Sequence, residues 1–416
     1  MAYFKGSAHI FVTLVVAMMG WFANMPIVAL VFLACVVLVE VAVQKTAESA
    51  VQAVFFGTFL FSDALELLKI EYIALVVCVI VVICVAVVVQ KWATSQRIKW
   101  NSVASGLACM VVATVFGGGI ANIGSTFWLA GVGATAGTLG GYLLLQGVAK
   151  RDKVAKTGAA VAVLLIVQSL VVLTENGEFL DNILYKILNV GWGVGNNVAL
   201  VLMMSAPLVL YAATKSRFAW VYVAIFCALI AVVMFSFSRG CILILMVSTP
   251  PMLVYAVMKA SHKKQIVWVL AIFAAIVAVF LWLNREQLLS LWGSVADKGL
   301  TDNGRFDLWR LAIEDFANGS IMFGRGLLFG SDISVEPPTF NWYHSSVLQM
   351  ISNFGVLGGV AFAYCLATRY RRLCTKGSYC ICAFMAIFMA ECYGLIDVTY
   401  FTPYYLLPLI VVLSAV

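Results

Sequence analysis

The sequence predicts an all-α protein: a polytopic membrane bundle of about 12–14 transmembrane helices, with one large extracytoplasmic loop that contains amphipathic helices. Of the 416 residues, 63% are hydrophobic and 11% are charged, whereas a soluble domain carries about a quarter charged residues. Apolar runs of about 20 residues recur along the chain, and this is the length that a helix needs to cross a bilayer. Strands of a membrane β-barrel would be shorter and would alternate in polarity.

Fourteen apolar segments divide the chain, and the longest polar interval between them spans 284–344. We therefore expect a helix bundle over 1–283, an extracytoplasmic catalytic loop over 284–344, and C-terminal transmembrane helices over 345–416. The apolar segments are 8–23, 26–43, 50–66, 72–90, 102–120, 124–147, 157–173, 196–213, 218–236, 240–258, 265–283, 345–368, 378–394 and 399–416.

The basic residues predict the orientation of these segments, because cytoplasmic connectors of membrane proteins are rich in Lys and Arg. With the N-terminus in the cytoplasm and the sides alternating, 18 of the 26 basic residues fall on the inner side. Of the 19 acidic residues, only Glu48 and Asp152 do so. This asymmetry places the 284–344 loop outside the cytoplasm. It also explains the net charge of +7 without a nucleic-acid partner.

The eleven cysteines do not indicate a disulfide framework or a metal site. None lies in the 284–344 loop, and most lie within apolar segments, as small buried residues do. Cys380 and Cys382 have no His or Cys neighbours at the spacing of a zinc site. No paired Asp residues suggest a site for a divalent cation either. We therefore expect no metal and no other cofactor.

Two arginines are candidates for binding an anion. Arg239 lies at an outer helix end, where an arginine is costly unless it is paired, functional or extended to the lipid phosphates. Arg305 precedes Phe306 and Trp309, which begin an apolar stripe at helical spacing, so it falls in the first turn of an amphipathic helix. There it lies beside free backbone N–H groups that bind phosphates, although a solvated surface charge is the plainer alternative.

The rest of the loop offers further polar groups. Asn318-Gly319 predicts the end of the amphipathic helix, and Arg310 and Arg325 are additional basic candidates for the same site. His344 is the only histidine on the predicted outer side and directly precedes an apolar segment. A neutral imidazole there is able to accept a proton from an attacking hydroxyl, or simply to bind backbone at the interface.

Other residues near His344 extend the candidate site. Tyr343 and Trp309 are suited to stacking on sugar rings or to anchoring the loop at the membrane surface. Asp397 lies between the last two apolar segments, near the outer face. It is placed either to orient His344, to pair with an arginine, or to form an ordinary turn.

In this order along the chain, these residues resemble the superfamily of O-antigen ligases and Wzy-type O-antigen polymerases. The resemblance covers roughly 235–400, and the N-terminal half is similar only as generic membrane helix. It rests on Ser238-Arg239-Gly240, Gly304-Arg305 with Trp309, Gly324-Arg325-Gly326, His344 with the helix after it, and Gly394-Leu395-Ile396-Asp397. The family's essential arginines would then be Arg239 and Arg305, and its essential histidine His344. Family members often carry Asn after the histidine, where this chain has Ser345.

The resemblance implies a bacterial glycosyltransferase of the plasma (inner) membrane. Its donor would be a glycan on undecaprenyl diphosphate, and its acceptor a growing glycan or lipid A-core. Arg239 and Arg305 would hold the diphosphate, while His344 deprotonates the acceptor hydroxyl, giving inversion without a metal. Polymerase, ligase and protein-directed transferase all fit this chemistry, and glycan-assembly proteins are expected partners.

Two other functions also fit the sequence. A transporter or flippase of lipid-linked oligosaccharides would explain the outer arginines, and it predicts charged groups at mid-membrane depth. A structural membrane partner in glycan assembly would need no reactive histidine.

Overall fold

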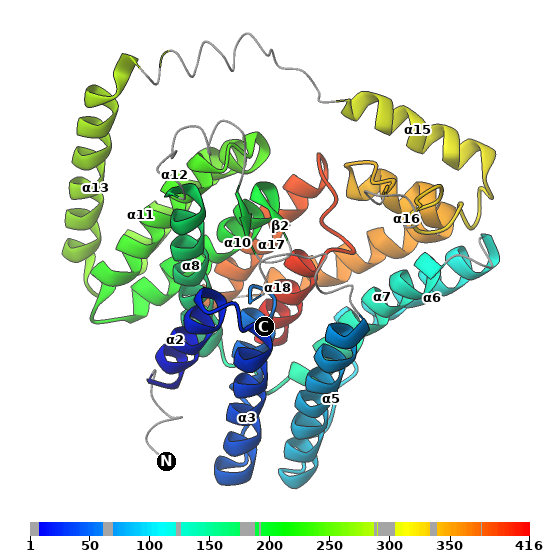
Figure 1. Cartoon of the computed structure of the whole chain (residues 1–416), viewed down its shortest axis with the longest axis horizontal. Coiled ribbons are helices and arrows are strands. Elements are labelled where there is room, and N and C mark those ends of the chain that lie inside the picture. The colour runs from blue at the N-terminus through cyan, green and yellow to red at the C-terminus, as the bar shows by residue number, and fades with distance from the viewer. Residues whose placement is uncertain are drawn as a thin grey trace.

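In the described part of the chain, each of the fourteen predicted apolar segments contains one helix, and a further helix, α15, lies in the polar interval (Figure 1). The computed structural model describes residues 8–60, 70–121, 126–174, 188–190, 193–286, 289, 304–332, 339–375 and 377–416. Apart from one hairpin of two-residue strands, β1 (Asn189–Val190) and β2 (Gly193–Val194), the regular structure in these ranges is helical. The helices are α2 (Ala8–Phe22), α3 (Pro26–Gln44), α4 (Ala50–Gly57), α5 (Ile70–Ala93), α6 (Ser102–Ala121), α7 (Thr126–Leu145), α8 (Arg151–Thr174), α10 (Gly195–Lys215), α11 (Ala219–Phe235), α12 (Arg239–Lys259), α13 (Lys263–Leu283), α15 (Arg305–Asn318), α16 (Ser346–Leu373), α17 (Ser378–Gly394) and α18 (Pro403–Ser414).

Eight of the described helices are long and apolar enough to cross a bilayer: α3, α5, α7, α8, α10, α12, α13 and α16. Five more apolar helices are shorter, with 10–17 residues. The chain is therefore a multi-pass membrane protein with the predicted all-helical architecture. The side of the membrane that each helix end faces remains a prediction from the distribution of basic residues.

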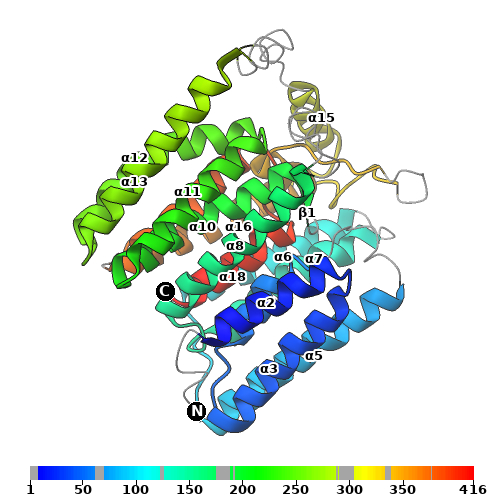
Figure 2. The same ribbon diagram turned by 60° about the vertical axis from the view of Figure 1, so that its left-hand side comes forward.

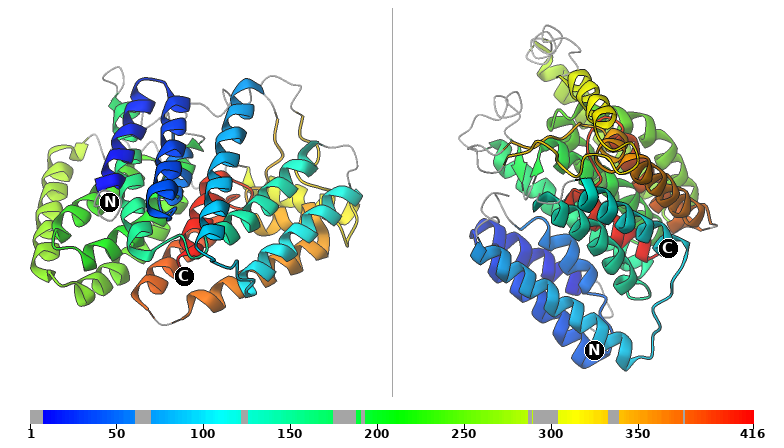
Figure 3. Two further views of the ribbon diagram at one scale, coloured as in Figure 1. Left: turned by 90° about the horizontal axis from the view of Figure 1, so that it is seen from below. Right: turned by 90° about the vertical axis from the view of Figure 1, so that its right-hand side faces the viewer.

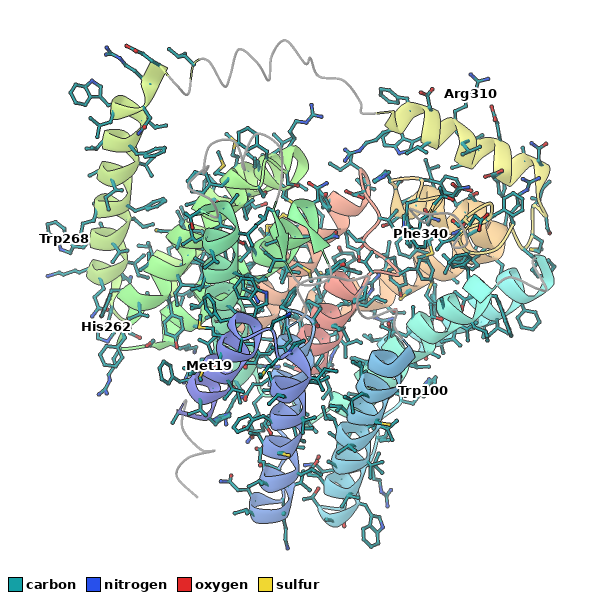
Figure 4. The ribbon with its side chains drawn as sticks, viewed as in Figure 1. Met19, Trp100, His262, Trp268, Arg310 and Phe340 are labelled. Atoms are coloured by element: carbon teal, nitrogen blue, oxygen red, sulfur yellow. The ribbon has the colours of Figure 1, made fainter. Side chains whose placement is uncertain are left out.

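The centre of the bundle is α10, and its edge is α13. In α10, 94% of the most apolar 18-residue stretch is buried. The helix packs against α8, α11, α12 and α17. In α13 the buried share is 6%, and the helix lies at the edge of the bundle, where it contacts α11 and α12 (Figures 1 and 2). Its Trp268 points away from the bundle (Figure 4). Lipid chains cover such an apolar face in a membrane.

Helix α18 begins later than the sequence predicts, at Pro403 rather than at residue 399. Residues 399–402 are non-helical but largely buried, with Thr399 and Tyr400 at most 1% exposed. Within a membrane such backbone is tolerated only where protein surrounds it and satisfies its polar groups. Here the backbone N–H of Thr399 donates to the hydroxyl of Ser346, at 3.0 Å. The start of α16 and the approach to α18 are therefore joined.

Helix α16 is broken at Gly355, whose φ of 63° and ψ of −157° lie outside the helical range. The loop 320–326 fills the break and pairs with the backbone groups that the kink releases. The pairs are Arg325 N to Ser352 O (3.0 Å), Gly326 N to Asn353 O (2.8 Å), Val356 N to Ile321 O (2.9 Å) and Leu357 N to Met322 O (3.2 Å). Beyond the kink α16 runs beside α6, as both panels of Figure 3 show.

The two ends of α16 mark two ends of the bundle. Its start, Ser346, follows His344 and lies beneath α15, and we call this the α15 end. At its other end Arg372 donates to the carbonyl of Val416, at 3.1 Å. Nearby, Arg151 at the start of α8 donates to the carbonyl of Ala415, at 3.1 Å. We call this the basic end.

Candidate active site

Helix α15 carries two of the predicted site residues on one face. It begins at Arg305, with Gly304 as N-cap at a φ of 75°. Asp302 and Asn303, residue types that favour a helix start, lie outside the described residues. Trp309 follows one turn later, and its indole N–H donates to the carbonyl of His344, at 3.3 Å. The contact between Trp309 and His344 sets the N-terminal turn of α15 over the start of α16. The helix ends at Asn318, as predicted.

His344 and Asp397 form the centre of the site. The His344 Nδ1 lies 2.9 Å from the Asp397 Oδ1, although the two residues are 53 positions apart in the chain. The Asp397 side chain is 14% exposed and that of His344 is 41% exposed. An ionised carboxylate only accepts hydrogen bonds, so the proton must lie on Nδ1. The Nε2 of His344 then carries the lone pair of the neutral ring.

The Asp397 carboxylate is held in its ionised form. Burial alone raises its pKa, but the hydrogen bond and charge of His344, together with donors from Tyr393 and Val398, outweigh burial and lower the pKa. The Tyr393 hydroxyl donates to Oδ2 at 2.7 Å, and the Val398 N–H donates to Oδ1 at 2.8 Å. With its oxygens occupied in this way, Asp397 has a fixed orientation toward the imidazole.

Arg305 lies beside this pair. Its Nη2 lies 3.9 Å from the Asp397 Oδ2, and its side chain is 27% exposed. At this distance it is a loose ion pair, so the guanidinium keeps donors available for another anion. It also lies at the N-terminus of α15, where backbone N–H groups add partial positive charge. An anion bound there would lie close to His344.

The backbone of Arg239 lies beside the same cluster. Arg239 is the first residue of α12 and is exposed. The next residue, Gly240, packs so closely that an added Cβ would lie 2.4 Å from Ile396 and 3.0 Å from Tyr393. The start of α12 therefore contacts the segment that carries Asp397. The structure thus brings three distant predicted elements to one place: the α12 start, the α15 start and His344.

The other candidates lie away from this centre. The Arg310 side chain is 80% exposed, pairs with Glu314 at 2.9 Å, and points away from the bundle (Figure 4). Arg325 is engaged by Asp315 at 2.9 Å and by the Phe329 ring at 4.4 Å. These contacts give Arg325 a role in holding its own loop.

Tyr343 belongs to that loop network as well. Its hydroxyl donates to Asp315 at 2.6 Å, and the residue is 1% exposed. Burial and this hydrogen bond raise the pKa of Tyr343. Such a buried ring has no face available for stacking on a sugar, so its contact with Asp315 anchors the segment before His344.

Sequence reasoning missed two residues that orient the site. Tyr393 precedes Asp397 by four positions, a spacing that one helical turn brings together, and this was a usable signal. The Ser346 hydroxyl accepts a hydrogen bond from the Thr399 N–H and also lies 3.1 Å from the Thr399 hydroxyl. No local sequence pattern indicates these two contacts. Ser345, the residue directly after His344, accepts the Leu348 N–H and caps α16.

Among the described residues, no three His, Cys, Asp or Glu side chains gather as metal ligands would. Comparison with models of protein families and with curated proteins finds no match for this chain. Its function is therefore inferred from the geometry of the site and from the membrane character of the fold.

Proposed function

We propose that this protein is a membrane glycosyltransferase that moves a glycan from a polyprenyl-diphosphate carrier to an acceptor sugar hydroxyl. The observation that carries the proposal is the pairing of His344 with Asp397 at 2.9 Å, with Arg305 at 3.9 Å from the same carboxylate. A base oriented by a carboxylate, next to an anion-binding cation, suits displacement of a diphosphate by a hydroxyl. The resemblance to O-antigen ligases and Wzy-type polymerases supports the same chemistry.

His344 would act as the general base. Asp397 accepts a hydrogen bond from the Nδ1–H group, so the proton stays on Nδ1 and the Nε2 lone pair is left to accept the proton of the acceptor hydroxyl. As the hydroxyl oxygen bonds to the anomeric carbon, its proton passes to Nε2. The imidazolium that forms is stabilised by the ionised Asp397. Attack from the face opposite the leaving group inverts the anomeric centre.

Arg305 and Arg239 would bind the diphosphate. The electron pair of the broken bond between the anomeric carbon and the phosphate oxygen passes to the leaving diphosphate, which gains negative charge. Guanidinium groups and the N-terminus of α15 stabilise that charge through charge-assisted hydrogen bonds. The prenyl chain of the carrier would remain in the bilayer beside the α15 end.

A flippase of lipid-linked oligosaccharides is the second candidate, and one observation favours it. Arg369 is fully buried in α16 and pairs with Glu391 of α17 at 3.0 Å, which is the kind of intramembrane charge that transporters use. The Tyr405 hydroxyl also contacts both groups. These contacts tie three helices together, so the pair also has a structural role.

The test is transfer by the purified protein from a labelled lipid-linked glycan to an acceptor glycan. We expect His344→Ala and Arg305→Gln to lower the turnover by about 100-fold or more. Arg310→Gln removes the same charge from the outward face of the same helix and should turn over like the unmodified protein.

Undiminished turnover in His344→Ala would remove the base from the mechanism. Translocation of the donor across vesicles without any new glycosidic bond would identify the flippase instead.

A further inference from the structure

A basic pocket of about 470 Å³ lies at the basic end of the bundle, far from the His344 cluster. The start of α8, the end of α10 and the start of α11 form its walls. Lys156, Lys215 and Arg217 line it, against a single carboxylate, Asp152. Asp152 already accepts a hydrogen bond from the Tyr211 hydroxyl, at 3.0 Å. The pocket thus has an excess of positive charge and suits an anion.

The backbone around the pocket adds to this preference. Helix α11 begins here, and its N-cap residue, Phe218, supplies no side-chain hydrogen bond to the first turn. The partial positive charge of a helix N-terminus therefore reaches the pocket. Lys215 and Arg217 are exposed, so their charged groups are able to approach an anion at the pocket mouth.

An apolar cavity of about 210 Å³ adjoins the basic pocket. Tyr211 lines both spaces: its hydroxyl is directed at Asp152, while its ring contributes to the apolar wall. The other walls come from α10, α12 and α17, with Met252 and Met385 among the lining side chains. Charged and apolar spaces therefore meet at one aromatic ring.

We propose that the two cavities together bind one anionic phospholipid from the leaflet at the basic end. The headgroup phosphate binds Lys215 and Arg217, with Lys156 nearby, and an acyl chain occupies the apolar cavity. Phe218, which lines the pocket, and Trp220, two residues later in the first turn of α11, are each 50% exposed and suited to the level of the lipid headgroups. Basic pockets between transmembrane helices are typical sites for anionic headgroups. A soluble phosphate compound has no acyl chain to occupy the apolar cavity.

This site is independent of the proposed glycosyl transfer. Helix α16 separates the two regions, and its 18 residues beyond Gly355 extend about 27 Å at 1.5 Å per residue. The bound lipid would contact α8, α10, α11, α12 and α17 at once, and would hold them together around the central helix.

The experiment is a titration of the purified full-length protein with dioleoyl phosphatidylglycerol and with dioleoyl phosphatidylcholine, followed by native mass spectrometry. We expect the anionic lipid to bind about tenfold tighter or more. The double variant Lys215→Gln/Arg217→Gln should weaken its binding by about 30-fold, which corresponds to about 1 kcal/mol for each charge. The matched control is Lys263→Gln/Lys264→Gln, two exposed lysines at the start of α13 that line neither cavity. It should retain the affinity of the unmodified protein.

Three results would overturn the proposal. Equal affinity for the two lipids would show that charge does not select the ligand. An equal loss in the control variant would show diffuse attraction to a basic surface. Competition by glycerophosphoglycerol, the headgroup without its chains, at concentrations similar to those of the lipid would identify a soluble phosphate ligand instead.

Discussion

His344 has a backbone φ of 48°, a value that side-chain-bearing residues rarely adopt. Phe237, two residues before Arg239, has a φ of 50°. Such conformations cost about 1–3 kcal/mol each and persist where surrounding contacts enforce them. At His344 those contacts are the Trp309 indole on its carbonyl and Asp397 on its ring. The imidazole is therefore held in place by both its backbone and its side chain.

Replacement of Asp397 by Asn tests whether the carboxylate selects the histidine tautomer. An amide is able to donate to Nδ1, which would leave the proton on Nε2 and remove the base. We expect the turnover number for glycan transfer to fall about 1,000-fold or more, while the KM for the donor changes little.

Glu314→Gln, an exposed change on α15, serves as the control and should be without effect. A turnover number of Asp397→Asn close to that of the unmodified protein would show that Asp397 has no orienting role.

At the scale of the element, the helices were predictable from the apolar runs of membrane length. Lipid offers the backbone N–H and C=O groups no hydrogen-bond partners, so such a run must satisfy them within its own helix. The departures come from contacts between distant segments. The kink at Gly355 depends on the loop 320–326, about 30 residues earlier, and no local pattern specifies that pairing. Likewise, residues 399–402 stay non-helical because the Ser346 hydroxyl accepts a hydrogen bond from the Thr399 N–H. Ser346 is more than 50 residues away in the chain.

The same limit applies to the site. The sequence order and the predicted outer placement of Arg239, Arg305 and His344 predict one common site, and the structure brings the starts of α12 and α15 to the segment that carries Asp397. The sequence did not show that Arg325 lies outside the site. Its partner, Asp315, comes within reach only when the loop folds back on α15. Arg310 lies on another face of α15 than Arg305, and the sequence alone does not say which face packs against the bundle.

Gly355→Ala tests the closeness of this contact between loop and helix. A Cβ at Gly355 would lie 2.5 Å from the backbone of Met322, and the φ of 63° disfavours any side chain. We expect the free energy of unfolding to fall by about 2–3 kcal/mol, measured by thermal denaturation in detergent.

Gly359→Ala, four residues later, is the matched control. Its added Cβ would meet only the Ile351 side chain at 3.4 Å, so the higher helix propensity of Ala should leave stability equal or slightly raised. Equal stability of Gly355→Ala and the unmodified protein would contradict the tight packing at the kink.

Across the whole molecule, ion pairs join helices that are distant in sequence. Glu48, after α3, binds Lys150 and Lys153 at the start of α8, the latter at 2.9 Å. Deeper in the bundle, the buried Arg369 and Glu391 connect α16 and α17. A single buried charge without its partner is costly. Separating the helices of such a pair would therefore leave an unpaired charge and destabilise the fold.

The Glu48 pair predicts a dependence of stability on pH. Burial alone raises the pKa of Glu48, but its hydrogen bonds to Lys150 and Lys153 outweigh burial and lower it below 4.5. The stabilisation is therefore complete above pH 4.5 and is lost as the pH falls through the lowered value. Glu48→Gln should cost about 2 kcal/mol at neutral pH, and the difference from the unmodified protein should shrink as the pH falls below 4.5.

Thermal unfolding of both proteins across this range measures the effect. Glu286→Gln, an 88% exposed acid that lies 3.9 Å from Arg285, provides the control with no expected change. A Glu48→Gln deficit that stays constant down to acid pH would exclude a charged Glu48 as its source.

The loop 320–326 and the broken α16 share their backbone hydrogen bonds, and this has a consequence for dissecting the protein. A water-soluble fragment cut at residues 284 and 344 would leave the amides of Arg325 and Gly326 without the carbonyls that receive them. The remaining membrane portion would expose the carbonyls of Ser352 and Asn353 within an apolar surrounding. Neither piece is self-sufficient, so the periphery of this protein and its interior must mature as one unit during biosynthesis.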